Sequence, residues 1–171
     1  MYAPGEYRSE RCRNWDYAVK AGDRIADEWP VANFAGGRYW LRTYGPNGFF
    51  REYAGGAGEP ALTVSAGYGL ASGNPDGSLV VTLTNTGAGS VDATLRDLSY
   101  GAAPTAVAVP AGATKTVRLA FASSANWYDL GITVAGADGW SRRLAGRCET
   151  GRTGSTDPLI GRKRGRAFRT E

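Results

Sequence analysis

The sequence predicts an all-β protein built around an Ig-like antiparallel β-sandwich, and three observations carry this prediction. Apolar and polar residues alternate in short runs, and turn residues interrupt these runs roughly every ten residues. The composition favours strands over helices, because 25 glycines and many valines, threonines and aromatic residues stand beside a single methionine. The third observation is an internal repeat, which predicts a partial second copy of the same unit.

The strand signals are clearest in the second half of the chain. Residues 79–84 alternate in polarity, residues 85–89 break the pattern with two glycines, and alternation resumes over residues 91–95. This order predicts a β-hairpin with a glycine-containing loop. Further alternating runs flank turns at residues 110–112 and 136–139, as expected for successive strands of a sandwich.

The repeat has a spacing of about 90 residues. Residues 19–22 match 109–112, residues 39–41 match 128–130, and residues 45–51 match 136–142. The second copy is complete and predicts a β-sandwich over residues 58–150. The first copy, residues 1–55, keeps only its C-terminal half, beginning with strands on either side of the Ala21-Gly22 turn, and residues 55–58 form the linker. Half a sandwich leaves a core face bare, so residues 1–55 must pack on the second copy, pair with another chain, or stay loose.

The chain contains no histidine, which removes imidazole acid–base catalysis, Ser-His and Cys-His nucleophile pairs, and histidine-based zinc sites. The acidic residues are scattered and show no metal-type spacing, so we expect no metal, no cofactor and no catalytic residue. The sequence contains no run of about 18 apolar residues, so it predicts no membrane-spanning helix. Residues 1–15 are polar and charged, and therefore lack the apolar core of a signal peptide.

Positive charge is concentrated at the end of the chain. Residues 142–171 hold nine basic and three acidic residues, whereas residues 1–141 carry a net charge of −2. We expect residues 151–171 to form a basic, disordered tail rather than a specific nucleic-acid site. The two cysteines, Cys12 and Cys148, are far apart in sequence, and whether they pair is left open.

Two segments carry a resemblance to a known family. The stretch GRYWLRTYGPNGFFREYAG over residues 37–55 resembles a motif of the C-terminal domain of bacterial phosphocholine-preferring phospholipase C. Residues 127–130, followed by 142–152 and 155–158, are similar to the end of that domain. In that family the domain occurs twice in tandem after a large catalytic domain, which agrees with the repeat found here. This chain lacks the catalytic domain, so no catalytic residue carries over.

The resemblance implies a function without catalysis in this chain. We expect a non-catalytic accessory module of an exported bacterial phospholipase C of lipid catabolism, which positions the catalytic domain, contacts phospholipid surfaces, or does both. The parent enzyme would be a phosphodiesterase-type hydrolase. The alternative from another class is a stand-alone adhesion or carbohydrate-binding β-sandwich, which the fold alone permits. The oligomeric state is not determined by the sequence.

The candidate contact residues are Trp40, Arg42 and Tyr44. Alignment of the two copies places Tyr39 and Leu41 on the core face of a strand, so the alternate residues occupy the opposite face. Aromatic residues beside an arginine suit a lipid–water boundary or a choline-type cation. The competing interpretations are that this face packs against another domain or the neighbouring repeat, or has no role.

Two further sets of residues are interpreted as structural. Gly45, Pro46, Asn47 and Gly48 have the composition of a tight turn between two strands. Arg51 and Arg142 follow the equivalent turns of the two copies, and we expect them to form ion pairs or to anchor backbone carbonyls rather than bind phosphate.

Overall fold

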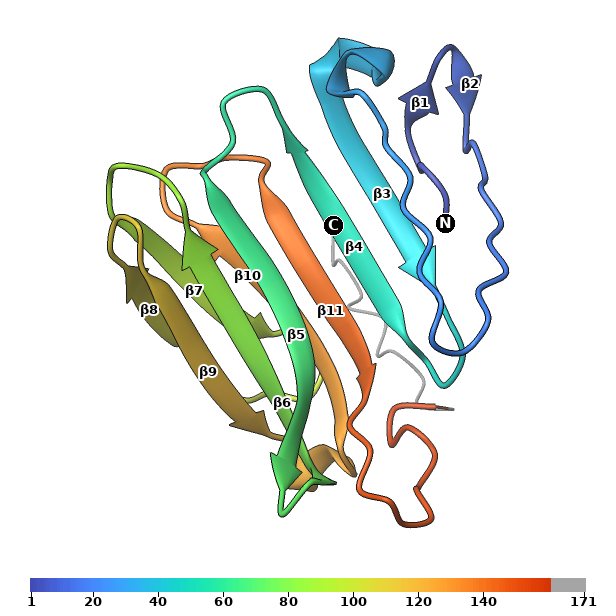
Figure 1. The fold of residues 1–171 in the computed structure, drawn as a ribbon, viewed down its shortest axis with the longest axis vertical. Coiled ribbons are helices and arrows are strands. Elements are labelled where there is room, and N and C mark those ends of the chain that lie inside the picture. The colour runs from blue at the N-terminus through green and yellow to red at the C-terminus, as the bar shows by residue number, and fades with distance from the viewer. Residues whose placement is uncertain (161–171) are drawn as a thin grey trace, which may run out of the picture.

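The structure, a computed structural model, describes residues 1–160, and β-strands make up nearly all of its regular structure (Figure 1). No α-helix occurs among these residues, which confirms the all-β prediction. In chain order the strands are β1 (Glu6–Tyr7), β2 (Glu10–Arg11), β3 (Arg38–Tyr44), β4 (Phe50–Gly56), β5 (Leu62–Ala71), β6 (Asn74–Asn85), β7 (Val91–Asp97), β8 (Thr105–Val109), β9 (Thr114–Ala120), β10 (Trp127–Val134) and β11 (Ser141–Arg147). Three short 3₁₀ helices are η1 (Val31–Asn33), η2 (Ala35–Gly37) and η3 (Ala122–Ser124). Among residues 1–160, no helix reaches the length and apolarity that crossing a membrane requires.

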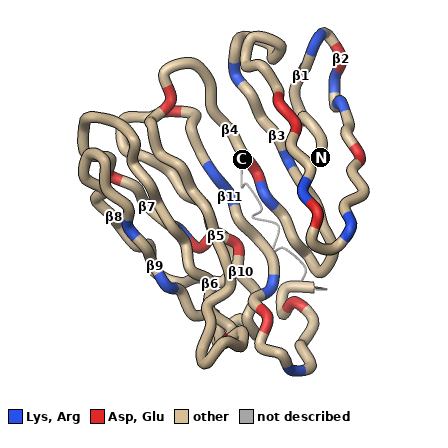
Figure 2. The backbone as a smooth tube through the Cα atoms, viewed as in Figure 1, with Lys and Arg blue, Asp and Glu red and all other residues tan. Residues whose placement is uncertain are grey.

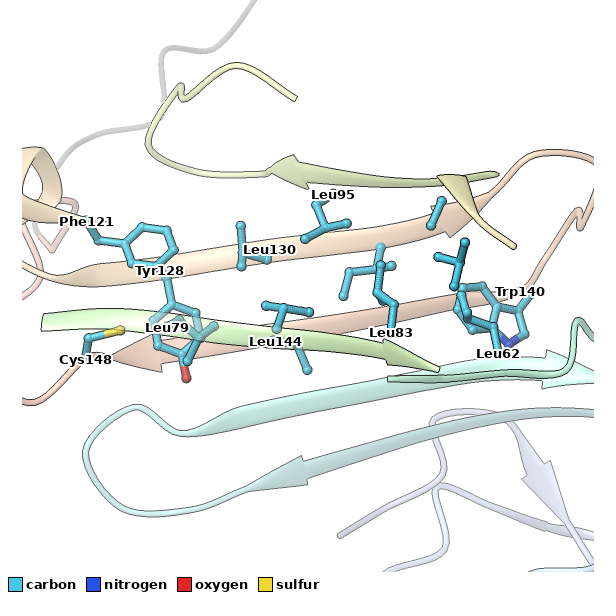
Figure 3. Packing of buried hydrophobic residues seen from close by; sticks show 14 residues of the cluster. Leu62, Leu79, Leu83, Leu95, Phe121, Tyr128, Leu130, Trp140, Leu144 and Cys148 are labelled. Atoms are coloured by element: carbon cyan, nitrogen blue, oxygen red, sulfur yellow. The ribbon is translucent and has the colours of Figure 1, made fainter. Parts of the chain in front are cut away.

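Two antiparallel sheets face each other and share one core. The first has the strand order β5-β6-β9, and the second has the order β3-β4-β11-β10-β7-β8. Apolar side chains from both sheets meet between them (Figure 3), which confirms the antiparallel β-sandwich. The Ig-like designation stays a prediction. The buried core residues are Leu62, Leu79, Val81, Leu83, Ala93, Leu95, Val109, Phe121, Tyr128, Leu130, Ile132, Trp140, Leu144 and Cys148.

Strand alternation explains why these residues are buried. Leu79, Val81 and Leu83 of β6 are fully buried, while the residues between them face away from the core. On β10, Leu130 and Ile132 follow the same alternation and face β6 across the core. Full burial of one large aliphatic side chain contributes about 1.5–3 kcal/mol, so this aliphatic layer is the main source of stability of the sandwich.

The prediction of a β-hairpin over residues 79–95 is wrong. β6 belongs to the three-stranded sheet and β7 to the six-stranded sheet, so the intervening segment crosses from one sheet to the other. The cause is Asn85, whose buried side-chain amide donates to the carbonyl oxygens of Gly89 at 2.7 Å and Val109 at 2.9 Å. These bonds hold the connection against the end of β8 instead of letting β7 fold back beside β6.

The N-terminal residues pack on the sandwich. The β3–β4 hairpin extends the larger sheet, because β4 pairs antiparallel with β11 over residues 50–54 and 141–145. Gly55 and Gly56 are part of β4, so the linker is shorter than the predicted residues 55–58. The strands expected on either side of the Ala21-Gly22 turn are absent from the described structure, although the turn forms, with the amide of Asp23 donating to the carbonyl of Lys20 at 3.0 Å.

The inner face of the β3–β4 hairpin has its own small cluster. Ala3, Tyr7, Phe34 and Leu41 are buried there. Trp15, Trp29, Tyr39, Tyr53 and Met1 pack around them. Figure 1 shows that the N-terminal segment with β1 and β2 lies beside β3. Irregular chain therefore covers the β3–β4 hairpin, whereas the three-stranded sheet covers β10 and β11.

The pairing of β4 with β11 is unchanged when the β3–β4 and β10–β11 hairpins are exchanged. Glu52 lies opposite Arg143 at the centre, and Ala54 faces Ser141 just as Ala145 faces Phe50. Ala54 has the same position in the β3–β4 hairpin as Ala145 has in the β10–β11 hairpin, and Phe50 has the same position as Ser141. The two pairs are therefore equivalent. Figure 2 shows charges of both signs in the middle of these two strands. The seam between the hairpins is thus a pseudo-two-fold contact of equivalent strands.

Two arginines clamp this seam in a reciprocal manner. Arg51 donates to the carbonyl of Ala145 at 3.1 Å and to the hydroxyl of Tyr128 at 3.3 Å. Arg142 donates to the carbonyl of Ala54 at 2.7 Å and to the hydroxyl of Tyr39 at 2.9 Å. The prediction that these arginines anchor backbone carbonyls is therefore confirmed.

Only part of the predicted tail lies within the described residues. Residues 151–160 run along the end of the sandwich, where the indole nitrogen of Trp127 donates to the carbonyl of Ser155 at 2.9 Å. This segment differs from the free extension that was expected. The strongly basic residues 161–171 lie outside the described residues.

Candidate functional site

The candidate site is the outer face of the β3–β4 hairpin, opposite the N-terminal cluster. Trp40, Arg42 and Tyr44 alternate with Tyr39 and Leu41 along β3. Leu41 is buried, whereas Trp40 is 41% exposed and Tyr44 is 59% exposed. The three candidates therefore share one face of the sheet, as the alignment of the two copies predicts.

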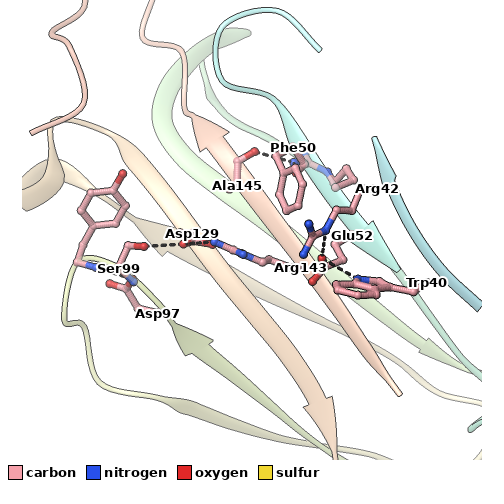
Figure 4. A network of polar contacts seen from close by, with 11 residues as sticks. Trp40, Arg42, Phe50, Glu52, Asp97, Ser99, Asp129, Arg143 and Ala145 are labelled. Atoms are coloured by element: carbon pink, nitrogen blue, oxygen red, sulfur yellow. Dashed lines mark hydrogen bonds and ion pairs between the residues drawn. The ribbon is translucent and has the colours of Figure 1, made fainter. Parts of the chain in front are cut away.

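Glu52 of β4 fixes two of these side chains (Figure 4). Its carboxylate accepts a hydrogen bond from the indole nitrogen of Trp40 at 2.9 Å and forms an ion pair with Arg42. Arg42 also lies over the Trp40 ring, with its guanidinium carbon 4.5 Å from the ring centroid. One carboxylate thus holds an aromatic ring and a cation in a fixed relative position.

A second part of the face is an aromatic row at the end of β3. The ring of Tyr44 stacks on Tyr2, with centroids 6.0 Å apart, and contacts Phe50 at 4.9 Å. Tyr2 pairs with β3 through two backbone hydrogen bonds to Arg42, at 2.8 and 2.9 Å. Arg42 donates to the Tyr2 hydroxyl at 3.0 Å, and this hydrogen bond lowers the pKa of Tyr2.

The face continues across the seam onto β11 and β10. Arg143 makes a bidentate ion pair with Asp129, at 2.7 and 2.8 Å, and lies 5.3 Å from the centroid of Phe50. The hydrogen bond to Asp129 raises the pKa of Arg143. Asp129 is only 6% exposed, and both Arg143 and Ser99 donate hydrogen bonds to its carboxylate.

We call the set Tyr2, Trp40, Arg42, Tyr44, Phe50, Glu52, Asp129 and Arg143 the outer-face cluster. Its charges are balanced, since Arg42 pairs with Glu52 and Arg143 pairs with Asp129. Glu52 and Phe50 were missed in the sequence, although alternation along residues 50–54 places them on the same face as Trp40. Tyr2 had no such signal, because its pairing with β3 spans the whole N-terminal segment.

The Gly45–Gly48 segment connects β3 to β4. The amide of Phe49 donates to the carbonyl of Pro46 at 3.1 Å, and Asn47 and Gly48 have positive φ angles of 55° and 71°. A side chain at Gly48 would also collide with the Trp127 ring, at 2.6 Å from an added Cβ. These features are those of a turn shaped by backbone constraints.

Groups able to bind a metal are scattered over the structure. Residues 1–160 contain no cluster of three or more cysteine, aspartate or glutamate side chains that could hold an ion. Cys12 and Cys148 are both free thiols, the first exposed and the second buried. Burial raises the pKa of Cys148 to about 12, so this thiol keeps its proton at neutral pH.

Most of the chain is similar to known bacterial proteins. The family model described as "Bacterial phospholipase C, C-terminal domain" matches residues 2–56 and 62–147. A non-hemolytic phospholipase C of Burkholderia pseudomallei is 36% identical over 152 residues, which are 85% of this chain and 21% of that protein. A non-hemolytic phospholipase C of Pseudomonas aeruginosa is 38% identical over 154 residues, again 85% of this chain and 21% of the relative. A hemolytic phospholipase C of Pseudomonas aeruginosa is 32% identical over 157 residues, covering 81% of this chain and 19% of the relative.

Proposed function

The chain belongs to the family of bacterial phospholipase C C-terminal domains, and from this premise we propose that it is a non-catalytic accessory module whose outer-face cluster contacts phospholipid surfaces. The chain spans about a fifth of the length of these relatives, so the activity of a whole enzyme belongs to the proposal. On this proposal the module acts outside the cell, beside a phosphodiesterase-type catalytic domain, and its own two copies, one partial and one complete, are the tandem repeat.

The observation that carries the proposal is an exposed aromatic surface with balanced charges. Trp40 and Tyr44 of β3 are partly exposed to solvent, and Glu52 accepts a hydrogen bond from the indole of Trp40. Tryptophan and tyrosine combine an apolar ring with a polar group, which suits the boundary between water and lipid. Since each arginine of the cluster has a carboxylate partner, attraction to the surface would come from ring burial more than from net charge.

The same observation weakens the other candidate functions. A nucleic-acid surface requires unpaired basic residues along one face, and the arginines of this face are paired. A stand-alone adhesion or carbohydrate-binding sandwich is compatible with the fold, but the family match favours the phospholipase context. Packing of the outer-face cluster against a catalytic domain is the outcome that the experiment below must separate from lipid contact.

Sedimentation with phosphatidylcholine vesicles tests the proposal. The full chain should cosediment weakly, and most of this binding should persist at 1 M salt, where the Debye length is about 3 Å. The combined Trp40→Ser and Tyr44→Ser variant should lose the salt-resistant binding and keep its far-UV circular dichroism. Tyr68→Ser is the matched control, because Tyr68 is 46% exposed on β5 of the other sheet.

Two results would overturn the proposal. One is vesicle binding that Tyr68→Ser reduces as much as the outer-face variant does. The other is absence of vesicle binding by the folded chain, which would assign the outer-face cluster to contacts with another domain. If the double variant unfolds, the single Tyr44→Ser variant repeats the test at the more exposed position.

A further inference from the structure

A polar hollow lies where the chain leaves β11 at the end of the sandwich. It has a volume of about 480 Å³ and contains Arg147 and Arg152 among its lining residues. The polar residues Asn126, Thr150, Thr153 and Ser155 also line it. A second hollow of about 410 Å³ shares Arg147, Arg152, Gly154 and Ser155 with the first. The two arginines therefore border both hollows, and neither hollow is lined by a residue of the outer-face cluster.

Arg147 has hydrogen-bonding capacity that the protein does not use. Its side chain is only 12% exposed, and its guanidinium reaches Glu149 at 3.4 Å, a long and weak contact. The Nε atom is buried and has no hydrogen-bond partner among residues 1–160. A buried charged donor without an acceptor is costly, and such a group indicates a bound water or ion.

Gly154 shapes the position of this guanidinium. A Cβ added to Gly154 would lie 2.2 Å from the central carbon of the Arg147 guanidinium, so the backbone of residue 154 is packed directly against that group. Any side chain at this position would displace Arg147. The segment that follows β11 is thereby fitted to a buried arginine that lines both hollows.

Other buried arginines on the sandwich differ from Arg147 in this respect. Arg51 and Arg142 each donate to carbonyl and tyrosine oxygens of the seam, and Arg143 is bidentate to Asp129. Within the described part of the chain, no ion pair joins Arg152 to a carboxylate. The acidic residue of the first hollow, Asp76, is itself paired with Arg118. Glu149 lines the second hollow and contacts Arg147 only at 3.4 Å, so Arg152 leaves the two hollows with an excess of positive charge.

From the unused hydrogen-bond donors and the charges of the hollow, we propose that Arg147 and Arg152 form a binding site for a phosphate-class oxyanion. Arginine binds tetrahedral oxyanions through parallel N–H donors, and hydroxyl and amide groups complete such sites. The ligand chemistry is that of inorganic phosphate or of an anionic lipid headgroup. This site is independent of the outer-face cluster, so failure of one proposal leaves the other standing.

Isothermal titration of the full chain with inorganic phosphate, at constant ionic strength, tests the site. We expect saturable binding to one site per chain. Arg152→Gln should weaken it about tenfold or more, the loss expected for one charge-assisted hydrogen bond. Arg96→Gln is the matched control, because Arg96 is exposed on β7 and its replacement changes the net charge equally. All variants share the basic residues 161–171, whose contribution therefore cancels.

Gly154→Ala gives a second test in which the net charge does not change. The added methyl group would displace the Arg147 guanidinium, and phosphate binding should fall as strongly as in Arg152→Gln. Thermal melting of this variant without phosphate verifies that the fold persists. If Gly154→Ala is unstable, Arg147→Lys keeps the charge and removes the planar donors, with the same expected loss.

A vesicle arm distinguishes the two sources of the anion. Binding to phosphatidylglycerol vesicles that inorganic phosphate inhibits, and that Arg152→Gln abolishes, would assign the site to a lipid headgroup. Vesicle binding unaffected by Arg152→Gln, combined with phosphate binding that it weakens, would assign the site to a soluble phosphate. The proposal is overturned if the chain shows no saturable phosphate binding, or if Arg96→Gln weakens binding as much as Arg152→Gln does.

Discussion

The β3–β4 and β10–β11 hairpins share one pairing pattern but occupy different surroundings. Tyr39 pairs with Gly55 as Tyr128 pairs with Gly146, and Leu41 and Leu130 hold equivalent positions. The second hairpin faces the aliphatic core beneath the three-stranded sheet, whereas the first is covered by a cluster of aromatic side chains from irregular chain. Backbone pairing is therefore the same in both, and the covering layer decides how much each hairpin contributes to stability.

The largest expected effect comes from truncating the two equivalent leucines. Leu130→Ala should lower the free energy of unfolding by about 2–5 kcal/mol, because it leaves a cavity between two regular sheets. Leu41→Ala should cost less, since irregular residues above it can move to fill the space. Urea denaturation of both variants, followed by far-UV circular dichroism, measures the difference. Equal losses in one shared transition would show that the two covering layers are equally rigid.

The next effect concerns the arginines of the seam. Removing either clamp leaves a tyrosine hydroxyl and a carbonyl without their donor, so Arg51→Met and Arg142→Met should each cost about 1–3 kcal/mol. We expect the larger loss for Arg142, whose side chain is only 12% exposed and also lies 3.7 Å from Glu59. Hydrogen exchange of the β4 and β11 amides would detect opening of the seam. Arg96→Met should leave these amides protected.

The two thiols provide a third contrast between the regions. Cys12 should react with an aromatic disulfide reagent at once, and Cys148 only as the protein unfolds, because one is exposed and the other buried. The pKa of Cys148 in the folded protein is raised to about 12, mainly by burial, above its ordinary value of 9.0. The unfolded state therefore loses this proton first, and stability should fall as the pH rises from about 9 towards 12.

Denaturation midpoints between pH 8 and pH 11 measure this dependence. Cys148→Ala should flatten the decline without abolishing it, since burial, together with a hydrogen bond to Glu59, also raises the pKa of Tyr39 to about 12. A Cys148→Ala protein with the same pH dependence as the wild type would contradict the assignment to this thiol.

The smallest effect is expected on the outer face. Glu52→Gln removes the ion pair with Arg42 and should lower the free energy of unfolding by about 1 kcal/mol or less, as for other partly exposed pairs. The amide oxygen introduced by this replacement can still accept a hydrogen bond from the indole of Trp40, so tryptophan fluorescence anisotropy should change little. Glu52→Ala should release Trp40 and lower the anisotropy. An unchanged anisotropy in Glu52→Ala would show that neighbouring rings alone hold Trp40.

Alternation and turn residues predicted much of the fold. They gave the all-β class, the sandwich and the face on which Leu41 lies, because residue polarity reports which side of a strand meets the core. They failed for the connection between Asn85 and Val91, since polarity reports the face of a strand but not the sheet to which it belongs. The deciding contacts of Asn85 join segments that lie apart in the chain.

Only part of the candidate site was predicted, because the sequence reports local spacing and not contacts between segments that are far apart in the chain. Trp40, Arg42 and Tyr44 belong to one strand, so their common face follows from local spacing. Glu52 required the register of the neighbouring strand, and Tyr2 required a contact with Arg42 across the N-terminal segment. Arg147 carried no sequence signal, because its unused donors are defined by what surrounds it in space.

The seam between β4 and β11 has a consequence for association. β11 pairs with its own equivalent, β4, so the edge of β11 is also complementary in shape to the β11 edge of another chain. An edge of this kind can recruit further chains. In this protein the β3–β4 hairpin occupies the edge of β11, and the opposed charges of Glu52 and Arg143 favour this partner over a second β11, which would oppose two arginines. Beyond it, Tyr2 bonds to the outer side of β3 at Arg42. The N-terminal residues thus close this edge of the six-stranded sheet, and β11 is not available to pair with a second chain.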